Sequence, residues 1–218
     1  MKKIILAILG VICIIFVVHK VYHGVVSYKI YTNLENFMAE ENRMYQVSMK
    51  DLNNIKNVQT VYRKNDIINC IKENDNKYCE WYNFITNENY SFNMNTKTVY
   101  RNTISLFDTQ TLFNLPHYIL ELTNNSKIKE VFAIFNIKYI TLEKFEDKMC
   151  YKIVTKNENI FVDCSTYLPV YSKMKVVNSN NDQKNYIENF YEFEIGNVTD
   201  EEVELPNLEE YTIIENEK

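Results

Sequence analysis

The sequence predicts an α+β fold: a curled antiparallel sheet (a half-barrel) with helices covering one face, preceded by one N-terminal transmembrane helix. Three observations lead to this prediction. An unbroken apolar run stands near the N-terminus, short stretches of alternating side chains fill most of the remaining chain, and two stretches of helical period interrupt them. Because a twisted sheet of many strands tends to curl, helices across its opening would enclose an apolar space.

The apolar run extends from Ile4 to Val18 and follows two lysines, Lys2 and Lys3. Fifteen helical residues rise about 22 Å, which is short of a hydrocarbon core of about 30 Å. The helix would therefore continue past Lys20, whose ammonium group can reach toward the lipid headgroups. No pattern of small residues marks a cleavage site after the run.

We therefore predict an uncleaved signal anchor over residues 1–27, with a cleaved signal peptide as the alternative. The lysines before the run would keep the N-terminus in the cytoplasm. Residues 28–218 would then form one extracytoplasmic domain with an acidic C-terminal tail, in a single-pass protein of the cell membrane. Cys13 follows Ile12 rather than a small residue, so the sequence does not favour lipidation there.

The charge of the chain excludes nucleic-acid binding. The chain carries a net charge of −5, and residues 28–218 carry −8 because three lysines lie in the anchor. A nucleic-acid partner requires basic patches that neutralise phosphates. The segment from Asp200 to Glu215 concentrates the negative charge and is expected to be a solvated tail.

The domain begins with an expected helix over residues 24–42, whose apolar side chains recur at three and four residues. Alternating stretches separated by Asn-rich turns then predict strands at 45–50, 58–63, 67–73, 78–86, 90–94 and 98–101. A helical stretch broken near Pro116 and a second helix over 127–135 follow. Strands starting at 138, 149, 159, 168 and 186 close the domain as a meander.

Four cysteines follow the anchor: Cys70, Cys79, Cys150 and Cys164. A two-residue loop at Asn74-Asp75 would place Cys70 directly opposite Cys79, and a three-residue loop at 156–158 would place Cys150 opposite Cys164. Directly opposed residues on antiparallel strands have a Cβ separation that a disulfide can use. Two bridges outside the cell are therefore one prediction, and four ordinary buried thiols are the other. A zinc site is not expected, because the spacings are long and no histidine accompanies them.

The few histidines give little support to catalysis or metal binding. His19 and His23 have the four-residue spacing of two ligands on one helix face, but polar residues are also expected where a helix leaves the membrane. His117 follows a helix break and has no nearby nucleophile pattern. Asp163 is the one acid between apolar strand residues, and we expect it to be a structural hydrogen-bonding group. We predict no catalytic residue, no metal and no cofactor.

The closing meander resembles the LolA/LolB superfamily of extracytoplasmic proteins, which are half-barrels of antiparallel strands lidded by helices. Three segments carry the resemblance: Phe161-Val162-Asp163 followed by Thr166-Tyr167-Leu168-Pro169, then Phe190 to Ile195, then Val203-Glu204-Leu205-Pro206. In element order the resemblance covers about residues 28–210, and in specific motif it covers 150–206. A sub-group of similar size is the clostridial germination protein GerS and its relatives.

The resemblance implies a non-enzymatic, membrane-anchored module that holds a lipid or another apolar ligand in the half-barrel. Candidate residues for the apolar cavity are Trp81, Phe84, Phe92, Phe113, Phe132 and Phe193. The alternative that the GerS resemblance implies is a cell-envelope protein partner, namely a cell-wall amidase that acts on the spore cortex. A tethered protein cannot shuttle a lipoprotein across a compartment, so the resemblance does not imply a carrier. An uncharacterised hydrolase is a third hypothesis, with little support in the sequence.

Overall fold

The computed structural model describes residues 2–50, 56–102, 115–123, 127–177 and 184–215. The chain forms two compact units: residues 1–35 with 116–169, and residues 36–115 with 170–218. The helices are α1 (Lys2–Ala39), α2 (His117–Thr123), α3 (Lys127–Asn136) and the short 3-10 helices η1 (Glu201–Val203) and η2 (Leu208–Glu210). The strands are β1 (Asn42–Lys50), β2 (Lys56–Lys64), β3 (Ile67–Glu73), β4 (Lys77–Asn83), β5 (Glu88–Asn93), β6 (Thr98–Asn102), β7 (Tyr139–Phe145), β8 (Lys148–Val154), β9 (Glu158–Asp163), β10 (Pro169–Val177), β11 (Lys184–Ile195) and β12 (Thr212–Glu215).

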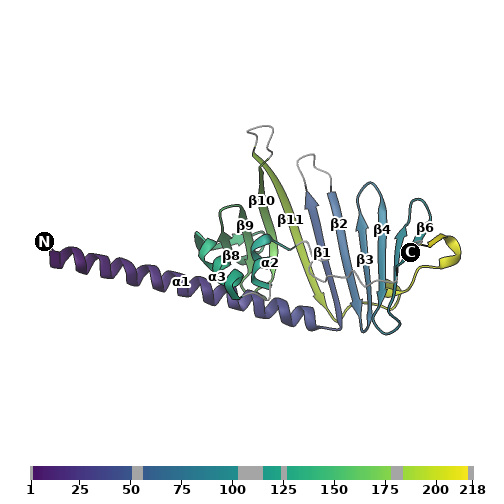
Figure 1. Cartoon of the computed structure of the whole chain (residues 1–218), viewed down its shortest axis with the longest axis horizontal. Coiled ribbons are helices and arrows are strands. Elements are labelled where there is room, and N and C mark those ends of the chain that lie inside the picture. The colour runs from purple at the N-terminus through teal and green to yellow at the C-terminus, as the bar shows by residue number, and fades with distance from the viewer. Residues whose placement is uncertain (1, 51–55, 103–114, 124–126, 178–183, 216–218) are drawn as a thin grey trace. The chain divides into compact units, whose positions relative to one another are not determined.

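Helix α1 is one unbroken helix, where the sequence suggested an anchor followed by a second helix over 24–42 (Figure 1). Gly24 lies inside it. A glycine costs about 1 kcal/mol in a helix relative to alanine, which is too little to end one. The buried positions Val26, Ile30 and Leu34 repeat at four residues after this glycine, so packing continues the helix.

The first unit packs three helical segments on one face of the antiparallel sheet β9-β8-β7. Strand register places Ile140, Ile153 and Ile160 on the same face as Glu158, and Glu158 hydrogen-bonds the start of α2. All three isoleucines are buried. The prediction of helices on one face of an antiparallel sheet therefore describes this unit.

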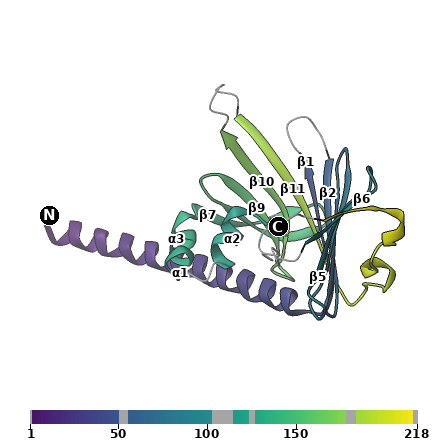
Figure 2. The same ribbon diagram turned by 45° about the vertical axis from the view of Figure 1, so that its right-hand side comes forward.

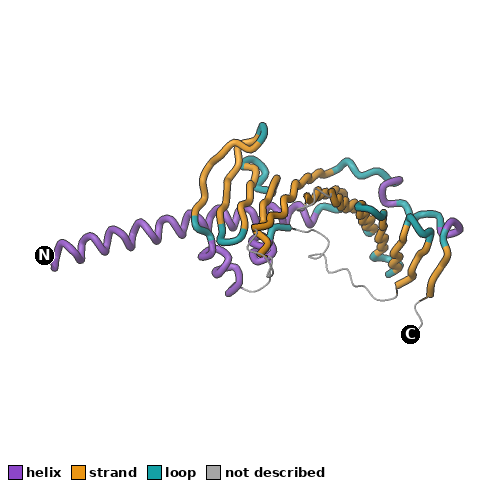
Figure 3. The backbone as a smooth tube through the Cα atoms, turned by 90° about the horizontal axis from the view of Figure 1, so that it is seen from above, coloured by secondary structure: helices purple, strands orange, loops and turns teal. Residues whose placement is uncertain are grey.

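The described residues of the second unit form nine strands in the order β12-β6-β5-β4-β3-β2-β1-β11-β10. Its neighbours are antiparallel except β12 and β6, which are parallel. Figure 3 shows these strands following a curve. The end strands β12 and β10 are not neighbours in the strand order, so the sheet stays open. The predicted α+β class with a curled, unclosed antiparallel sheet is confirmed.

The turns use asparagine where other proteins use glycine. Asn65 and Asn87 have positive φ values of 52° and 54°, a backbone region that asparagine tolerates better than most residues. The predicted strand 78–86 ends earlier, at Asn83, because its side-chain carbonyl accepts hydrogen bonds from the backbone N–H groups of Ile85 and Thr86. These two bonds close a turn, so the exposed side chain of Ile85 lies outside the strand.

Both predicted disulfides are wrong, because each hairpin differs by one residue from the predicted register. Cys70 pairs with Glu80, and Cys79 pairs with Ile71. Since successive strand residues point to opposite faces, Cys70 and Cys79 project from opposite sides of the sheet. In the same way Cys150 pairs with Asp163 instead of Cys164. All five cysteines are free thiols.

The hairpin loops explain these one-residue differences. Between β3 and β4 the loop has three residues, since Glu73 pairs with Lys77. The side-chain carbonyl of Asn74 accepts from the Asn76 backbone N–H at 2.8 Å, which stabilises the longer loop. Between β8 and β9 the backbone N–H of Thr155 donates to the carbonyl of Glu158 at 2.9 Å, so this loop is shorter than the predicted one.

Candidate functional site

Helix α1 changes character along its length. Every described side chain from Ile4 to His19 is exposed. From His23 onward one side is buried, and the buried residues recur at three or four: His23, Val26, Ser27, Ile30 and Leu34. The helix is long and apolar enough to cross a membrane, and its most apolar stretch is not buried inside the protein. The apolar end and the packed end therefore belong to one continuous element.

Lys20 lies where the exposed part of α1 ends and ties it to α3. Its Nζ donates to the backbone carbonyls of Phe135 at 3.2 Å and Ile137 at 2.9 Å. The same Nζ lies 5.9 Å from the ring centroid of Phe16 and 5.6 Å from that of Phe135. A cation at the C-terminal end of a helix satisfies carbonyls that lack partners within that helix. This lysine therefore holds α3 beside the last turn of the apolar run.

A buried polar group, the Ser27 hydroxyl, follows about two turns after Lys20 on α1. The Ser27 hydroxyl donates to the carbonyl of His23 at 2.7 Å, and the hydroxyls of Ser27 and Tyr118 are 2.5 Å apart. Since the single Ser27 proton goes to His23, Tyr118 is the donor in the second bond. Burial raises the pKa of Tyr118, so its phenol stays protonated. The pair joins α1 to α2 in the core of the first unit.

The His19 and His23 side chains form no metal site with other described residues. Their ring centroids are 4.1 Å apart. The His23 side chain is fully buried, and neither of its ring nitrogens has a hydrogen-bond partner among the described residues. Within the part of the chain that the structure describes, no group of three His, Cys, Asp or Glu side chains could hold a metal ion.

Glu158, a buried acid that sequence reasoning missed, fixes the start of α2. Its two carboxylate oxygens accept hydrogen bonds from the backbone N–H groups of His117 at 2.9 Å and Tyr118 at 3.1 Å. These donors have no partner within the helix, and a carboxylate also suits the positive end of the helix dipole. Glu158 lies in a polar stretch of the sequence, where nothing distinguishes it from exposed acids. Its role follows only from strand pairing.

Asp163 organises the turn that carries most of the family resemblance. Its Oδ1 accepts from the backbone N–H of Ser165 at 2.7 Å and from the Ser165 hydroxyl at 2.6 Å, and its backbone N–H donates to the carbonyl of Leu168. Burial opposes ionisation of Asp163, but the Ser165 hydrogen bonds and Lys148 outweigh it and lower the pKa of Asp163. The acid therefore serves the turn into β10.

The predicted cavity residues that the structure describes differ in their surroundings. Trp81 and Phe92 are buried in an aromatic cluster of the second unit. Phe193 contacts the rings of Phe37 and Tyr45 on the opposite sheet face. Phe84 and Phe132 are exposed, and Phe113 lies outside the described residues.

The chain's own C-terminal segment covers the face that carries Trp81 and Phe92 (Figures 2 and 3). The Trp81 indole N–H donates to the carbonyl of Val203 at 2.8 Å, and the Tyr211 ring meets the Phe92 ring edge-on at 5.0 Å. These contacts bury both predicted cavity residues. The expectation of a solvated acidic tail is corrected: most of the acidic residues are exposed on a segment whose apolar residues pack on the sheet.

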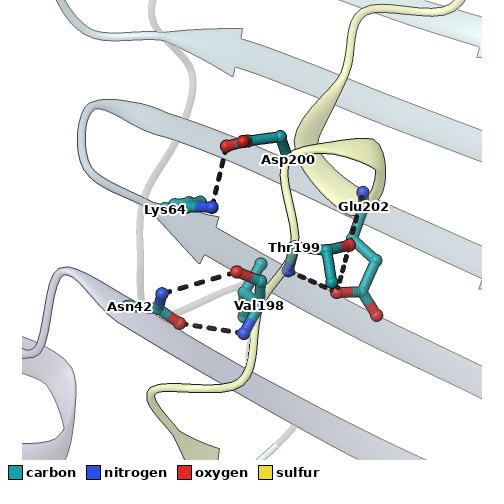
Figure 4. A network of polar contacts seen from close by, with 6 residues as sticks. All are labelled: Asn42, Lys64, Val198, Thr199, Asp200 and Glu202. Carbon is teal, nitrogen blue, oxygen red and sulfur yellow. Dashed lines mark hydrogen bonds and ion pairs between the residues drawn. The ribbon is translucent and has the colours of Figure 1, made fainter.

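A polar network fixes the beginning of this C-terminal segment (Figure 4). The Asn42 side chain accepts from the Val198 backbone N–H at 2.9 Å and donates to the Val198 carbonyl at 3.4 Å. Asp200 forms an ion pair with Lys64 at 2.7 Å. Glu202 accepts from both the backbone N–H and the hydroxyl of Thr199. The segment is therefore attached at its start as well as along its apolar residues.

The opposite face of this sheet carries buried aromatic and aliphatic side chains together with polar ones. Tyr45, Val47 and Tyr191 are each at most 5 % exposed. Beside them the Ser172 hydroxyl lies 2.9 Å from the Tyr191 hydroxyl and accepts from the Asn189 amide at 3.4 Å. The Asn189 side-chain oxygen is buried and has no partner among the described residues. We call this surface the inner face; it is defined by Tyr45, Val47, Ser172, Asn189 and Tyr191.

The solved structures that are similar to this chain include a crystal structure of an uncharacterized conserved protein from Thermus thermophilus. It is 10% identical, with 87% of this chain and 98% of that chain covered and a TM-score of 0.45. A DUF1329 family protein from Desulfovibrio piger is 11% identical, with 82% and 95% covered and a TM-score of 0.33. No family model matches the chain, and no curated protein matches it. No family membership follows from these likenesses.

The environments of Cys70, Cys79 and His117, three titratable groups considered in the sequence, differ from one another. Burial raises the pKa of Cys70 and of Cys79 to about 12, which keeps both as thiols. His117 is largely exposed and lies 3.7 Å from Glu121 of its own helix.

Proposed function

We propose that this protein is a single-pass membrane protein whose extracytoplasmic part is a non-enzymatic binding module for a lipid or another apolar ligand. The observation that carries the proposal is the change along α1 from an all-round exposed apolar helix to a packed core helix. Apolar side chains exposed on every side of a helix are costly in water, and a bilayer removes them from water. Because the helix is continuous, the same element anchors the chain and builds its first unit.

The orientation follows from the flanking charges. Lys2 and Lys3 precede the apolar run, and basic residues favour the cytoplasmic side of a membrane. The folded part of the chain then lies outside the cytoplasm. Its net negative charge is compatible with a domain that does not bind anionic lipid through a general basic surface.

The inner face supports the ligand class. Its buried tyrosines and valine provide an apolar wall, and the Asn189 oxygen, which has no partner within the described part of the chain, provides one hydrogen-bond acceptor. Ligand sites combine mostly apolar walls with a few polar groups that orient the ligand. A ligand with an apolar body and a donor group would match the inner face.

A non-enzymatic role is supported by the structural use of the candidate chemical groups. Asp163 holds a turn, Glu158 holds a helix start, and the Cys70 and Cys79 thiols are buried with a raised pKa. No described contact favours the amidase-partner role over ligand binding, and that role stays an expectation of the GerS resemblance.

The ligand proposal is tested by purifying a fragment of residues 22–218 without detergent and identifying bound molecules by native mass spectrometry. This fragment keeps every buried residue of α1. We expect an acyl-chain compound that is retained by the fragment and lost in Asn189→Leu, which removes the polar acceptor but keeps an apolar side chain. The matched control is Phe84→Leu on an exposed turn, which should retain the compound. A folded fragment with no bound compound contradicts the ligand proposal and leaves the anchor untouched.

A further inference from the structure

Helix α3 belongs to the first unit and carries an exposed apolar strip. The proposed ligand site in the second unit does not use this strip. Val131, Phe132 and Phe135 are 51 %, 64 % and 56 % exposed. They lie at positions i, i+1 and i+4 and share one side of the helix. Ala133 and the following Ile137 are fully buried, so the other side of α3 packs into the first unit. Exposed apolar side chains that are grouped in one strip are typical of a contact surface, whereas those of an ordinary solvated face are scattered singly.

The position of this strip along α1 identifies what it contacts. The Lys20 ammonium donates to the carbonyls of Phe135 and Ile137 at the end of α3. The same ammonium lies near the rings of Phe16 and Phe135 at 5.9 and 5.6 Å. Phe16 belongs to the apolar run of α1, and Phe16 and Lys20 are one helical turn apart, about 6 Å along the axis. The Phe135 ring is therefore level with the last turn of the run.

We infer that α3 is an interfacial helix whose Val131, Phe132 and Phe135 strip enters the same bilayer that α1 crosses. This inference rests on the proposed anchor. If the apolar run occupies the hydrocarbon, a side chain level with its last turn lies at the boundary between acyl chains and headgroups. Amphipathic helices bind there with their apolar face buried about 5–10 Å.

Two further residues agree with a membrane surface at this level. Tyr22 follows Lys20 by two residues and is 41 % exposed on α1, and tyrosines are enriched at membrane interfaces. Lys20 itself combines an apolar stem with a charged end that can reach the headgroups. Figures 1 and 2 both show α3 beside α1. The first unit would thus rest on the membrane through two elements, and α3 would fix its rotation about the anchor.

The test uses the full chain in phosphatidylcholine nanodiscs that contain lipids with a doxyl quencher at a chosen depth. Tryptophan is introduced as Phe132→Trp in one variant and as Phe16→Trp in another, and the unmodified chain supplies the baseline of the buried Trp81. We expect quenching of Phe16→Trp by lipids labelled within the hydrocarbon. We expect quenching of Phe132→Trp, with blue-shifted emission, by lipids labelled close to the headgroup. The Trp81 baseline should be unchanged by either label.

The two proposals fail in different ways. If Phe16→Trp is quenched while Phe132→Trp is not, the anchor stands and the interfacial role of α3 is overturned. This holds whether the emission of Phe132→Trp is that of a solvated indole or that of an indole buried against protein. If neither variant is quenched, the anchor fails and the inference fails with it.

Discussion

The Tyr118 hydroxyl of α2 donates to the Ser27 hydroxyl of α1 at 2.5 Å, inside the buried core of the first unit. Ser27 stands only nine residues after the end of the apolar run at Val18. One helix thus carries both a membrane-type surface and a partner for a buried tyrosine. If α1 is the membrane anchor that we propose, the first unit is built on this anchor and is not connected to it by a linker.

This hydrogen bond predicts that Ser27→Ala destabilises the protein more than Tyr118→Phe does. Ser27→Ala leaves the buried Tyr118 hydroxyl without its partner and should lower the free energy of unfolding by about 1–3 kcal/mol. Tyr118→Phe removes the donor while Ser27 keeps its bond to the His23 carbonyl, so it should cost about 1 kcal/mol or less. Denaturant unfolding of the full chain in detergent measures both. Equal costs, or a larger cost for Tyr118→Phe, would contradict the assigned donor direction.

The dependence on α1 predicts where a soluble fragment can begin. A fragment of residues 22–218 keeps Val26 and Ser27, whereas a fragment of residues 28–218 loses both. Losing the burial of Val26 alone should cost about 1.5–3 kcal/mol, and the unpaired Tyr118 hydroxyl should add to this. Thermal unfolding of the two fragments makes the comparison. Equal stability would show that residues 22–27 belong to the anchor alone.

The lowered pKa of Asp163 predicts a loss of stability in acid. Because its folded pKa lies below the unfolded value of about 3.9, the stabilisation is complete above that value and disappears as the pH falls through the folded pKa. Asp163→Asn should remove this part of the pH dependence and lower stability at neutral pH. Denaturant unfolding of both proteins at a series of pH values from about 2 to about 7 checks this. If the free energy of unfolding of the wild type changed with pH in parallel with that of Asp163→Asn, the role of the carboxylate would be contradicted.

The strand register predicts free thiols at Cys70, Cys79, Cys150 and Cys164, and Cys13 in α1 is a fifth. Mass spectrometry of the denatured, unreduced chain after alkylation should find all five cysteines modified. In the native protein, Cys70 and Cys79 should react slowest, because both are buried and the pKa of each is raised to about 12. A gain of four modified cysteines only after reduction would restore the two bridges and refute the register.

Much of the fold could be predicted because alternation and helical period are local signals. The register could not, since it depends on single hydrogen bonds in the loops. The Asn74 side chain supports a three-residue loop, and the Thr155 backbone pairs with Glu158 to shorten the hairpin between β8 and β9. One residue in each case moves a cysteine to the other face, so the predicted disulfide pattern was wrong.

The surroundings of the candidate site residues also depend on contacts between residues that are distant in the sequence. The side chains of Trp81 and Phe92 are apolar in any fold, but which segment covers them depends on contacts with Val203 and Tyr211, more than a hundred residues away. This packing could not be predicted from the C-terminal segment itself, because its acidic composition is typical of a solvated tail. The sequence places Lys20 at the membrane exit, yet its bonds to α3 are visible only in the structure.

Membrane extraction combined with protease treatment of intact cells tests the proposal that α1 anchors an extracytoplasmic module. Intact cells that express the full chain are treated with protease, and their isolated membranes are extracted with alkaline carbonate. We predict that the chain stays in the membrane pellet and that protease removes the folded part from outside the cells. Release of the intact chain by carbonate, or protection of the folded part in intact cells, would contradict it.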